Sequence, residues 1–289
     1  MIWSAAAWRR FGQSADKSAH TATQFNMDLG INNKVALVAA ASTGLGRAVA
    51  EELAAEGTKL ILCARNEERL KATADAIAQS TGADVFQRRA DVTKRRDISE
   101  LVTAALERFG RIDILVTNAG GPPAGTFDQL SAEQWEAAAH LTLFSTIELA
   151  RAVLPGMKER RWGRILNITS IAVKQPVDNL ILSNSLRAAV TGFARTLANE
   201  VATHGITVNN ILPGYTRTDR VEELAQQMAQ KLGIKPDEFK KKWEQEIPMR
   251  RLGEPREFAA LAAFLVSERA AYITGTSIQV DGGWIRSLF

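Results

Sequence analysis

Short apolar runs alternate with longer helical stretches along most of the chain, and this alternation constrains the fold more than any other feature. The apolar runs are rich in Val, Ile and Leu, as is typical of strands covered on both faces. We predict strands over residues 34–40, 58–63, 84–88, 112–117, 163–168, 206–211 and 277–280. We predict helices over residues 45–56, 66–79, 94–109, 131–155, 180–203, 219–246 and 255–267. The pattern predicts an α/β fold, a single-domain Rossmann-like doubly wound parallel sheet of about seven strands flanked by helices.

The length of the chain allows one domain with a large core. It has 289 residues, of which 46% are hydrophobic and 24% are charged. Residues 1–30 are expected to be a poorly ordered N-terminal extension; a mitochondrial presequence and an upstream start codon are the alternatives for residues 1–26. Residues 31–289 are expected to form the Rossmann-like domain, in which residues 215–251 are a long insertion before the last helix.

Charge, hydropathy and cysteine content exclude several partners. The formal charge is +4 and the basic residues are scattered, with no recognition module, so no nucleic-acid partner is expected. No apolar run approaches the roughly 18–20 residues of a membrane span, so no membrane partner is expected. Cys63 is the one cysteine and is expected to be buried, which favours a reducing, cytoplasmic location. No metal site is predicted.

The loops at the carboxyl ends of the strands are the predicted binding site, because doubly wound sheets bind ligands there. The turn that ends in Gly44-Leu45-Gly46 opens a helix, and its glycines allow a pyrophosphate to approach the backbone and the helix N-terminus. Arg65 ends the second strand. A guanidinium there binds a 2′-phosphate that an acid would repel, so NADP is the expected cofactor and NAD the less expected one.

Several further segments carry a resemblance to a known family. They are A-A-A-S-T-G-L-G at 39–46, Asp91-Val92, T-N-A-G at 117–120, G-R-I-L-N-I-T-S at 163–170, Pro213-Gly214 and Val280-Asp281-Gly282-Gly283. From about Lys34 to Trp284 the chain resembles the short-chain dehydrogenase/reductases, and most resembles a divergent group similar to β-ketoacyl-carrier-protein reductases. The resemblance implies an NAD(P)-dependent oxidoreductase that acts on a carbonyl/alcohol pair. It also implies a small-molecule or acyl-thioester substrate and a homodimer or homotetramer.

The same resemblance implies a set of site residues. The cofactor-binding residues that it and the loops indicate are Ala40, Ser42, Thr43, Gly44, Leu45, Gly46, Arg65, Asp91, Val92, Asn118, Ala119, Gly120, Arg187, Pro213, Gly214, Thr216 and Thr218. The family's cofactor motif opens with Thr-Gly, where this chain has Ala39-Ala40. If Ala40 adopts a positive φ, the cost is on the order of 1 kcal/mol, which would weaken cofactor binding without abolishing it.

The catalytic tetrad of the resembling family, Asn, Ser, Tyr and Lys, is altered. Neither tyrosine of the chain begins a Y-x-x-x-K motif. The resemblance implies that the four positions are held by Thr142, Ser170, Ser183 and Arg187. A serine hydroxyl is a much weaker acid than a phenol, and an arginine stays charged, so proton donation is expected to be impaired. Arg187 would still hold ribose hydroxyls and a developing oxyanion.

Three residues are candidates for the missing acid. They are Lys174 in the loop after Ser170, Tyr215 after Pro213-Gly214, and Asp178; their alternatives are a solvent-facing lysine, a packing tyrosine and a helix N-cap. The predicted catalytic set is Ser170, Ser183, Arg187 and Lys174. The resemblance also implies that residues 215–251 form a lid over the substrate. In this lid, Lys240, Lys241, Lys242, Arg250 and Arg251 either attract a phosphopantetheine or acyl-CoA substrate or form a solvated helix face. A dinucleotide-binding protein without turnover, acting as a sensor or partner subunit, and a non-redox enzyme using the same cleft are the alternative functions.

Overall fold

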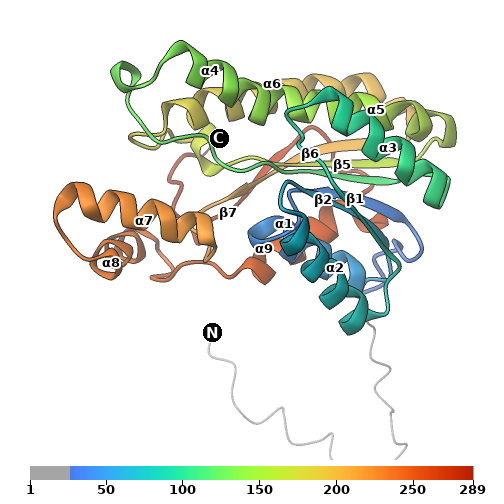
Figure 1. The fold of residues 1–289 in the computed structure, drawn as a ribbon, viewed down its shortest axis with the longest axis horizontal. Helices are drawn as coiled ribbons and strands as arrows, with labels where there is room; N and C mark the ends of the chain where they lie inside the picture. Colours follow the sequence, from blue (N-terminus) through green and yellow to red (C-terminus); the bar gives the residue numbers. More distant parts are fainter. Residues whose placement is uncertain (1–26, 289) are drawn as a thin grey trace, which may run out of the picture.

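Seven parallel strands form one sheet at the centre of the molecule (Figure 1). The structure is a computed structural model that describes residues 27–288. The sheet order is β3-β2-β1-β4-β5-β6-β7. The strands are β1 (Val35–Ala39), β2 (Lys59–Ala64), β3 (Val85–Arg89), β4 (Ile114–Thr117), β5 (Gly163–Ile168), β6 (Ile206–Pro213) and β7 (Ser277–Val280). The predicted fold class is confirmed, and the predicted strands match within a few residues.

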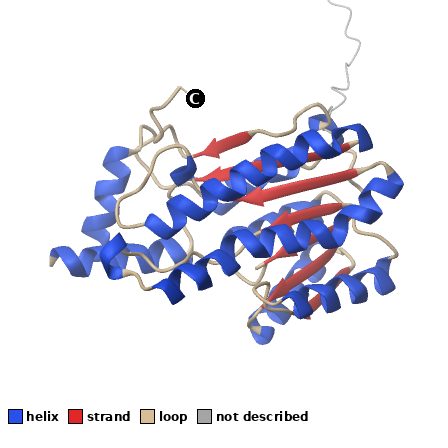
Figure 2. Cartoon of the chain, turned by 90° about the horizontal axis from the view of Figure 1, so that it is seen from above, coloured by secondary structure: helices blue, strands red, loops and turns tan. Residues whose placement is uncertain are grey.

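Helices cover both faces of this sheet, as Figures 1 and 2 show. On one face lie α1 (Gly44–Ala55), α2 (Glu67–Thr81) and α9 (Pro255–Leu265). On the other face lie α3 (Arg95–Phe109), α5 (Ser145–Arg160) and α6 (Ile181–Val201). Three further helices, α4 (Ala132–Ala139), α7 (Asp219–Leu232) and α8 (Pro236–Glu246), lie toward the carboxyl ends of the strands. Short 3-10 turns occupy Phe127–Gln129, Ile171–Val173, Ala202–His204 and Glu268–Ala270.

Strand β1 shows why the apolar runs lack polar alternation. Ala36 and Val38 pack into the cluster on the side of α1 and α9, whereas Leu37 and its alternating neighbours pack into the cluster on the side of α3, α5 and α6. Both faces of this strand are therefore buried, and every position needs an apolar side chain. In the register of the sheet, Val38 pairs with Leu62 of β2 and with Val116 of β4. The chain reverses its winding direction between β1 and β4, where such sheets bind ligands.

Two predicted helices are interrupted, and the sequence explains one interruption better than the other. The helix predicted over 219–246 is two helices, because Gly233 ends α7 at a φ of 65° and Pro236 begins α8. The helix predicted over 131–155 continues to Arg160 but contains a π turn at His140–Phe144 between α4 and α5. No residue type in that segment predicts a π turn.

The folded body begins slightly before the predicted boundary at residue 31. Leu29 is buried in the core, and its carbonyl accepts a hydrogen bond from the amide of Glu268. Arg269 Nε donates to the Asp28 carbonyl at 2.8 Å. The predicted poorly ordered extension lies, for residues 1–26, outside the described residues.

One helical stretch meets the length and composition of a membrane span, which the sequence analysis did not expect. Residues 132–160 form 29 consecutive helical residues with a mean hydropathy of 1.2 in the most apolar window. Part of this stretch is buried in the fold, since α4 packs against α6 and α5 against α3 and the sheet, whereas Phe144 is exposed. A core helix passes the same test, so this is weak support for a membrane span.

Candidate active site

The turn between β1 and α1 has the geometry that a phosphate-binding turn requires. Its backbone is left-handed at Ala40, with a φ of 49°, and at Gly44, with a φ of 58°. A Cβ on Gly46 would lie 2.4 Å from the Ala40 carbonyl oxygen and 2.8 Å from Asn118 Nδ2, so only glycine fits. No acidic residue occupies the first turn of α1, which leaves its N-terminus favourable for an anion. These residues fit a dinucleotide pyrophosphate.

Relief of the backbone strain at Ala40 gives a testable prediction. We expect Ala40→Gly to stabilise the protein by up to about 1 kcal/mol, because glycine adopts a positive φ without a Cβ clash. Urea unfolding measures the effect. The matched control is Ala76→Gly on the exposed side of α2, which is expected to destabilise by about 1 kcal/mol. Loss of stability at both positions would contradict strain at Ala40.

The adenosine end of the predicted site brings Arg65 and Asp91 together. Arg65 is exposed just after β2 and forms no ion pair within residues 27–288. Partial burial opposes ionisation of Asp91, but hydrogen bonds from the Thr93 amide and hydroxyl, together with the charge of Arg65, keep its pKa below the ordinary value. Val92 next to it is buried. A cation therefore faces solvent where the second strand ends, beside an ionised carboxylate.

At the other end of the cleft, Arg187 is anchored to the end of β5. Its Nη1 donates to the carbonyls of Ile168 at 3.0 Å and Thr169 at 2.7 Å. Burial, reinforced by the nearby charge of Arg220, lowers the pKa of Arg187 to about 10. It remains a cation near neutral pH, because this value lies well above pH 7. Nε and Nη2 of Arg187 have no hydrogen-bond partner in the part of the chain that the structure describes.

The other residues predicted for the tetrad are Ser170, Ser183 and Thr142. Ser170 begins the Ile171–Val173 turn, and its Oγ accepts a hydrogen bond from the Ala172 amide at 3.1 Å. Ser183 lies one turn before Arg187 on α6 and is partly buried. Thr142 lies in the π turn between α4 and α5, and its buried hydroxyl has no partner among the described residues.

A small cavity joins the two groups of predicted residues. It has only about 10 Å³ of space for a water-sized molecule, which is room for a single water. Asn118 and Ala119 from the loop after β4 line it together with Thr142 and Arg187. The complete lining is Thr117, Asn118, Ala119, Thr142, Thr146, Ile168, Thr169, Arg187 and Val190. The structure thus places a predicted cofactor-binding loop and the predicted catalytic cation on the wall of the same cavity.

The three candidate acids are held in different ways. Lys174 Nζ donates to Gln279 Oε1 on β7 at 2.7 Å, so the lysine is partly buried rather than free in solvent. The ring of Tyr215 stacks on Trp243 at 4.4 Å, and burial raises the pKa of its phenol to about 12. Asp178 is exposed, and Leu180 rather than Asp178 is the N-cap of α6. A raised pKa makes Tyr215 a weaker acid than an ordinary phenol, which favours a packing role.

The remaining predicted residues lie where the lid leaves the sheet. Pro213 ends β6, and a Cβ on Gly214 would lie 2.7 Å from the Asp281 Cα, so the two loops touch. Thr218 is the N-cap of α7, and its Cγ2 would lie 3.7 Å from a Cβ on Gly44. The lid therefore begins against the glycine turn. Thr216 is buried.

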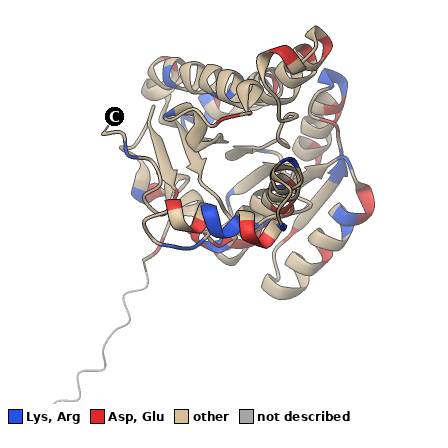
Figure 3. Ribbon diagram, turned by 90° about the vertical axis from the view of Figure 1, so that its left-hand side faces the viewer, with Lys and Arg blue, Asp and Glu red and all other residues tan. Residues whose placement is uncertain are grey.

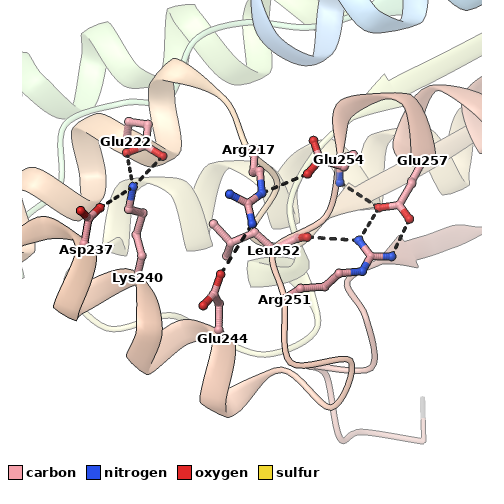
Figure 4. A network of polar contacts seen from close by, with 9 residues as sticks. All are labelled: Arg217, Glu222, Asp237, Lys240, Glu244, Arg251, Leu252, Glu254 and Glu257. Atoms are coloured by element: carbon pink, nitrogen blue, oxygen red, sulfur yellow. Dashed lines mark hydrogen bonds and ion pairs between the residues drawn. The ribbon is translucent and has the colours of Figure 1, made fainter.

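Some of the basic residues of the lid have carboxylate partners. Figure 3 shows acidic and basic residues interspersed on the lid helices, and Figure 4 shows the contacts. Lys240 pairs with Glu222 and Asp237, which raises its pKa. The other pairs are Arg217 with Glu244 and Glu254, and Arg251 with Glu257. These contacts neutralise Lys240 and Arg251 of the five predicted cations. Lys241, Lys242 and Arg250 are exposed and have no carboxylate partner within residues 27–288, so a solvated face and an acyl-carrier-binding patch both remain predictions.

Arg220 is a residue of the cleft that the sequence did not indicate. It is the second residue of α7, and its Nη2 donates to the Pro122 carbonyl at 3.0 Å. A Cβ on Gly121 would lie 2.8 Å from Arg220 Nε, so this glycine makes room for the guanidinium. The one signal in the sequence is that Arg220 follows Thr218, a predicted cofactor-binding residue, by two positions. Within the described residues, no group of three or more His, Cys, Asp or Glu side chains could hold a metal ion.

Comparison with known proteins identifies the class. Residues 39–285 match the family model described as Enoyl-(Acyl carrier protein) reductase. The chain is 36% identical over 255 residues to 3-oxoacyl-[acyl-carrier-protein] reductase FabG of Vibrio cholerae, which covers 88% of this chain and 98% of that protein. The chain belongs to the short-chain dehydrogenase/reductase family. Within it, the chain is similar to FabG-type ketoacyl reductases, including that of Escherichia coli, at 36% identity over 88% of this chain and 98% of that one.

Solved structures agree with this placement. L-sorbose reductase of Gluconobacter frateurii, complexed with NADPH and L-sorbose, superposes with a TM-score of 0.87 at 34% identity, covering 91% of this chain and all of that one. Actinorhodin polyketide ketoreductase with NADPH superposes with a TM-score of 0.84 at 33% identity, over 88% of this chain and 98% of the other. A 7α-hydroxysteroid dehydrogenase complexed with NADH has a TM-score of 0.82 at 32% identity, over 91% of this chain and 98% of the other. The chain is thus an NAD(P)-dependent oxidoreductase by family.

Proposed function

We propose that this protein is an NADP-dependent oxidoreductase that interconverts a carbonyl and an alcohol in the cleft between Ser170, Ser183 and Arg187. The observation that carries the proposal is that the predicted cofactor loop and Arg187 line the same small cavity. Similarity to ketoacyl reductases supports a small-molecule or acyl-thioester carbonyl substrate. A cytoplasmic location is part of the proposal, because Cys63 is the one cysteine of the sequence and cannot form an internal disulfide.

Each residue of the proposed site has its own role in the reaction. When bound, the nicotinamide supplies or accepts a hydride. Ser170 and Ser183 hold the substrate oxygen by hydrogen bonds, and the guanidinium of Arg187 stabilises negative charge that develops on it. Positioning of the reactants can lower the barrier by about 7–11 kcal/mol, whereas a general acid contributes about 10²–10⁴-fold in rate. Catalysis therefore survives the lost phenol, at a reduced rate.

Two measurements test the proposal. Titration with NADPH, followed by its fluorescence, establishes cofactor binding, and a panel of ketones and alcohols then establishes turnover. NADPH binding with no turnover on a broad panel would reject the oxidoreductase. The structure offers one specific reason to keep a dinucleotide-binding protein without turnover as the second candidate: Tyr215, the phenol nearest the cleft, has a raised pKa and packs in the lid.

Cofactor preference gives a second prediction. We expect NADPH to bind at least about tenfold more tightly than NADH, because an unpaired guanidinium at Arg65 contributes a charge-assisted hydrogen bond to a 2′-phosphate. Arg65→Asp is expected to reverse this preference. The test is to measure the dissociation constants for NADPH and NADH by fluorescence. Equal affinities for the two nucleotides in the unmodified protein would refute the predicted preference for NADPH.

We also propose a homodimer or homotetramer with two-fold symmetry. Tyr272 and Leu288 near the C-terminus are fully or almost fully exposed, which leaves apolar surface for a second copy to cover. Light scattering at micromolar concentration is expected to give two or four times the mass of one chain. A monomer mass under these conditions would contradict the proposal.

A further inference from the structure

The positive charge of Arg187 has no counter-charge in the cleft. Two of its donors, on Nη1, are used by the carbonyls of Ile168 and Thr169, which are neutral. No carboxylate in residues 27–288 lies within ion-pair distance of it. A partly buried cation without a partner is costly, because burial removes the water that would otherwise stabilise the charge.

Arg220 adds a second positive charge to the same cleft. Its guanidinium lies against the loop at Gly121 and Pro122, close enough to Arg187 to disfavour the charged form of that residue. Within residues 27–288, its one ion pair is with Glu223, 3.8 Å away, and both side chains are well exposed, which makes this a weak pair. The net charge between the two arginines is therefore positive.

The groups around these arginines do not supply an anion. Ser170 and Ser183 carry hydroxyls, which stay neutral, and the phenol of Tyr215 also stays protonated near neutral pH. The cofactor phosphates are expected at the N-terminus of α1. Asn118 stands next to that turn, since its Nδ2 donates to the Ala40 carbonyl at 3.4 Å, and it also lines the cavity beside Arg187. The missing anion must therefore come from a bound molecule, either the cofactor phosphates or the substrate.

We propose that the substrate carries a carboxylate, which binds between Arg187 and Arg220 while the adjacent carbonyl or hydroxyl lies at Ser170 and Ser183. The proposal rests on the proposed function and narrows its substrate to short 2-oxo or 3-oxo acids and the corresponding hydroxy acids. A guanidinium offers two parallel N–H donors, which match the two oxygens of a carboxylate. A thioester has no charge to offer, so acyl thioesters are expected to be poor substrates.

The test is binding of 2-oxobutyrate, acetoacetate and phenylpyruvate, each compared with its methyl ester, to the complex of the protein with NADP⁺. Both partners are oxidised, so no hydride moves and calorimetry reports affinity alone. We expect at least one acid to bind roughly 10- to 100-fold more tightly than its ester, which is the value of a hydrogen-bonded charge. Equal affinities within every pair, or no binding of any acid, would overturn the proposal.

Matched variants test whether Arg220 provides the positive charge that binds the carboxylate. Arg220→Met is expected to abolish the preference for the acid and to leave the affinity for NADP⁺ unchanged. Lys231→Met is the control, because Lys231 is an exposed cation near the end of the same helix, and it is expected to keep the preference. A loss of NADP⁺ affinity in Arg220→Met with the acid preference intact would assign Arg220 to the cofactor phosphates and overturn the proposal.

The proposed function and this inference fail in different ways. If acids bind in preference to esters but NADPH reduces none of them, the reductase is rejected and the carboxylate site stands. If ketone esters and thioesters are reduced as well as the acids, the reductase stands and the carboxylate site is rejected.

Discussion

Replacement of Ser183 by Tyr together with Arg187 by Lys is expected to raise the rate of NADPH-dependent ketone reduction by about 10²–10⁴-fold, the contribution of a general acid. The lysine ammonium, one helical turn away, lowers the pKa of the new phenol toward neutrality, which a serine hydroxyl cannot approach. Both side chains lie on the same face of α6, because four residues are about one turn. Steady-state kinetics on the ketone panel measure the gain.

The matched control is Ser183→Phe with Arg187→Lys. It has the same ring and the same cation but no hydroxyl, so any difference between the two double variants belongs to the phenol. Leu186 and Val177 border this position: Leu186 is buried against α4, and the backbone of Val177 is tied to α6 by the Asn184 side chain. Circular dichroism and NADPH titration establish that both variants fold and bind. Equal rates in two folded, NADPH-binding variants would count against the reductase.

Asp113→Ala is expected to destabilise the protein by roughly 3 kcal/mol, the largest effect on stability that we predict. Asp113 is fully buried at the start of β4, and its Oδ2 accepts from the Val35 amide at 3.0 Å. Its Oδ1 lies 2.7 Å from Arg111 and 3.6 Å from Arg160. Removing the carboxylate leaves a buried amide without a partner and two arginines without a counter-charge. Partial exposure of both arginines keeps the effect below that of a fully buried pair.

Urea unfolding, followed by tryptophan fluorescence, measures this effect. The control is Asp84→Ala, which removes a surface ion pair with Arg108 in which both side chains are about half exposed. It is expected to cost less than about 1 kcal/mol, because solvent screens an exposed pair. Similar losses in the two variants would show that the buried carboxylate has no special role.

The sheet could be predicted from the sequence because burial on both faces leaves little choice of residue. Every residue of β1 packs on one helical layer or the other, so the apolar run and the strand coincide. Helix ends were predictable where a glycine adopts a left-handed backbone, as at Gly82 and Gly110. The break before Pro236 was missed, although the residues that cause it are visible, because the apolar spacing continues across it.

The candidate site could be predicted at positions where the structure admits only one residue type. Gly46 must be glycine because the Ala40 carbonyl leaves no room for a Cβ. The positive φ at Ala40, which the sequence analysis considered only as a condition, is present. Arg220 could not be predicted, because it reaches the cleft from the lid and makes its contact with a loop nearly one hundred positions earlier in the chain. The partners of Lys174 and the neutralised lid cations are likewise set by tertiary contacts that leave no local pattern.

The π turn at His140–Phe144 has a consequence for how related chains are aligned. An α-helical residue turns the helix by about 100°, so the extra residue held in this turn shifts the phase of everything after it. Trp135 before the turn packs toward α6, whereas Leu149 after it packs toward the sheet. If a relative has an unbroken α-helix here, an alignment of the two chains requires a one-residue gap inside this helix. Without that gap, the alignment would assign the residue equivalent to Thr142 to the wrong side of the cleft.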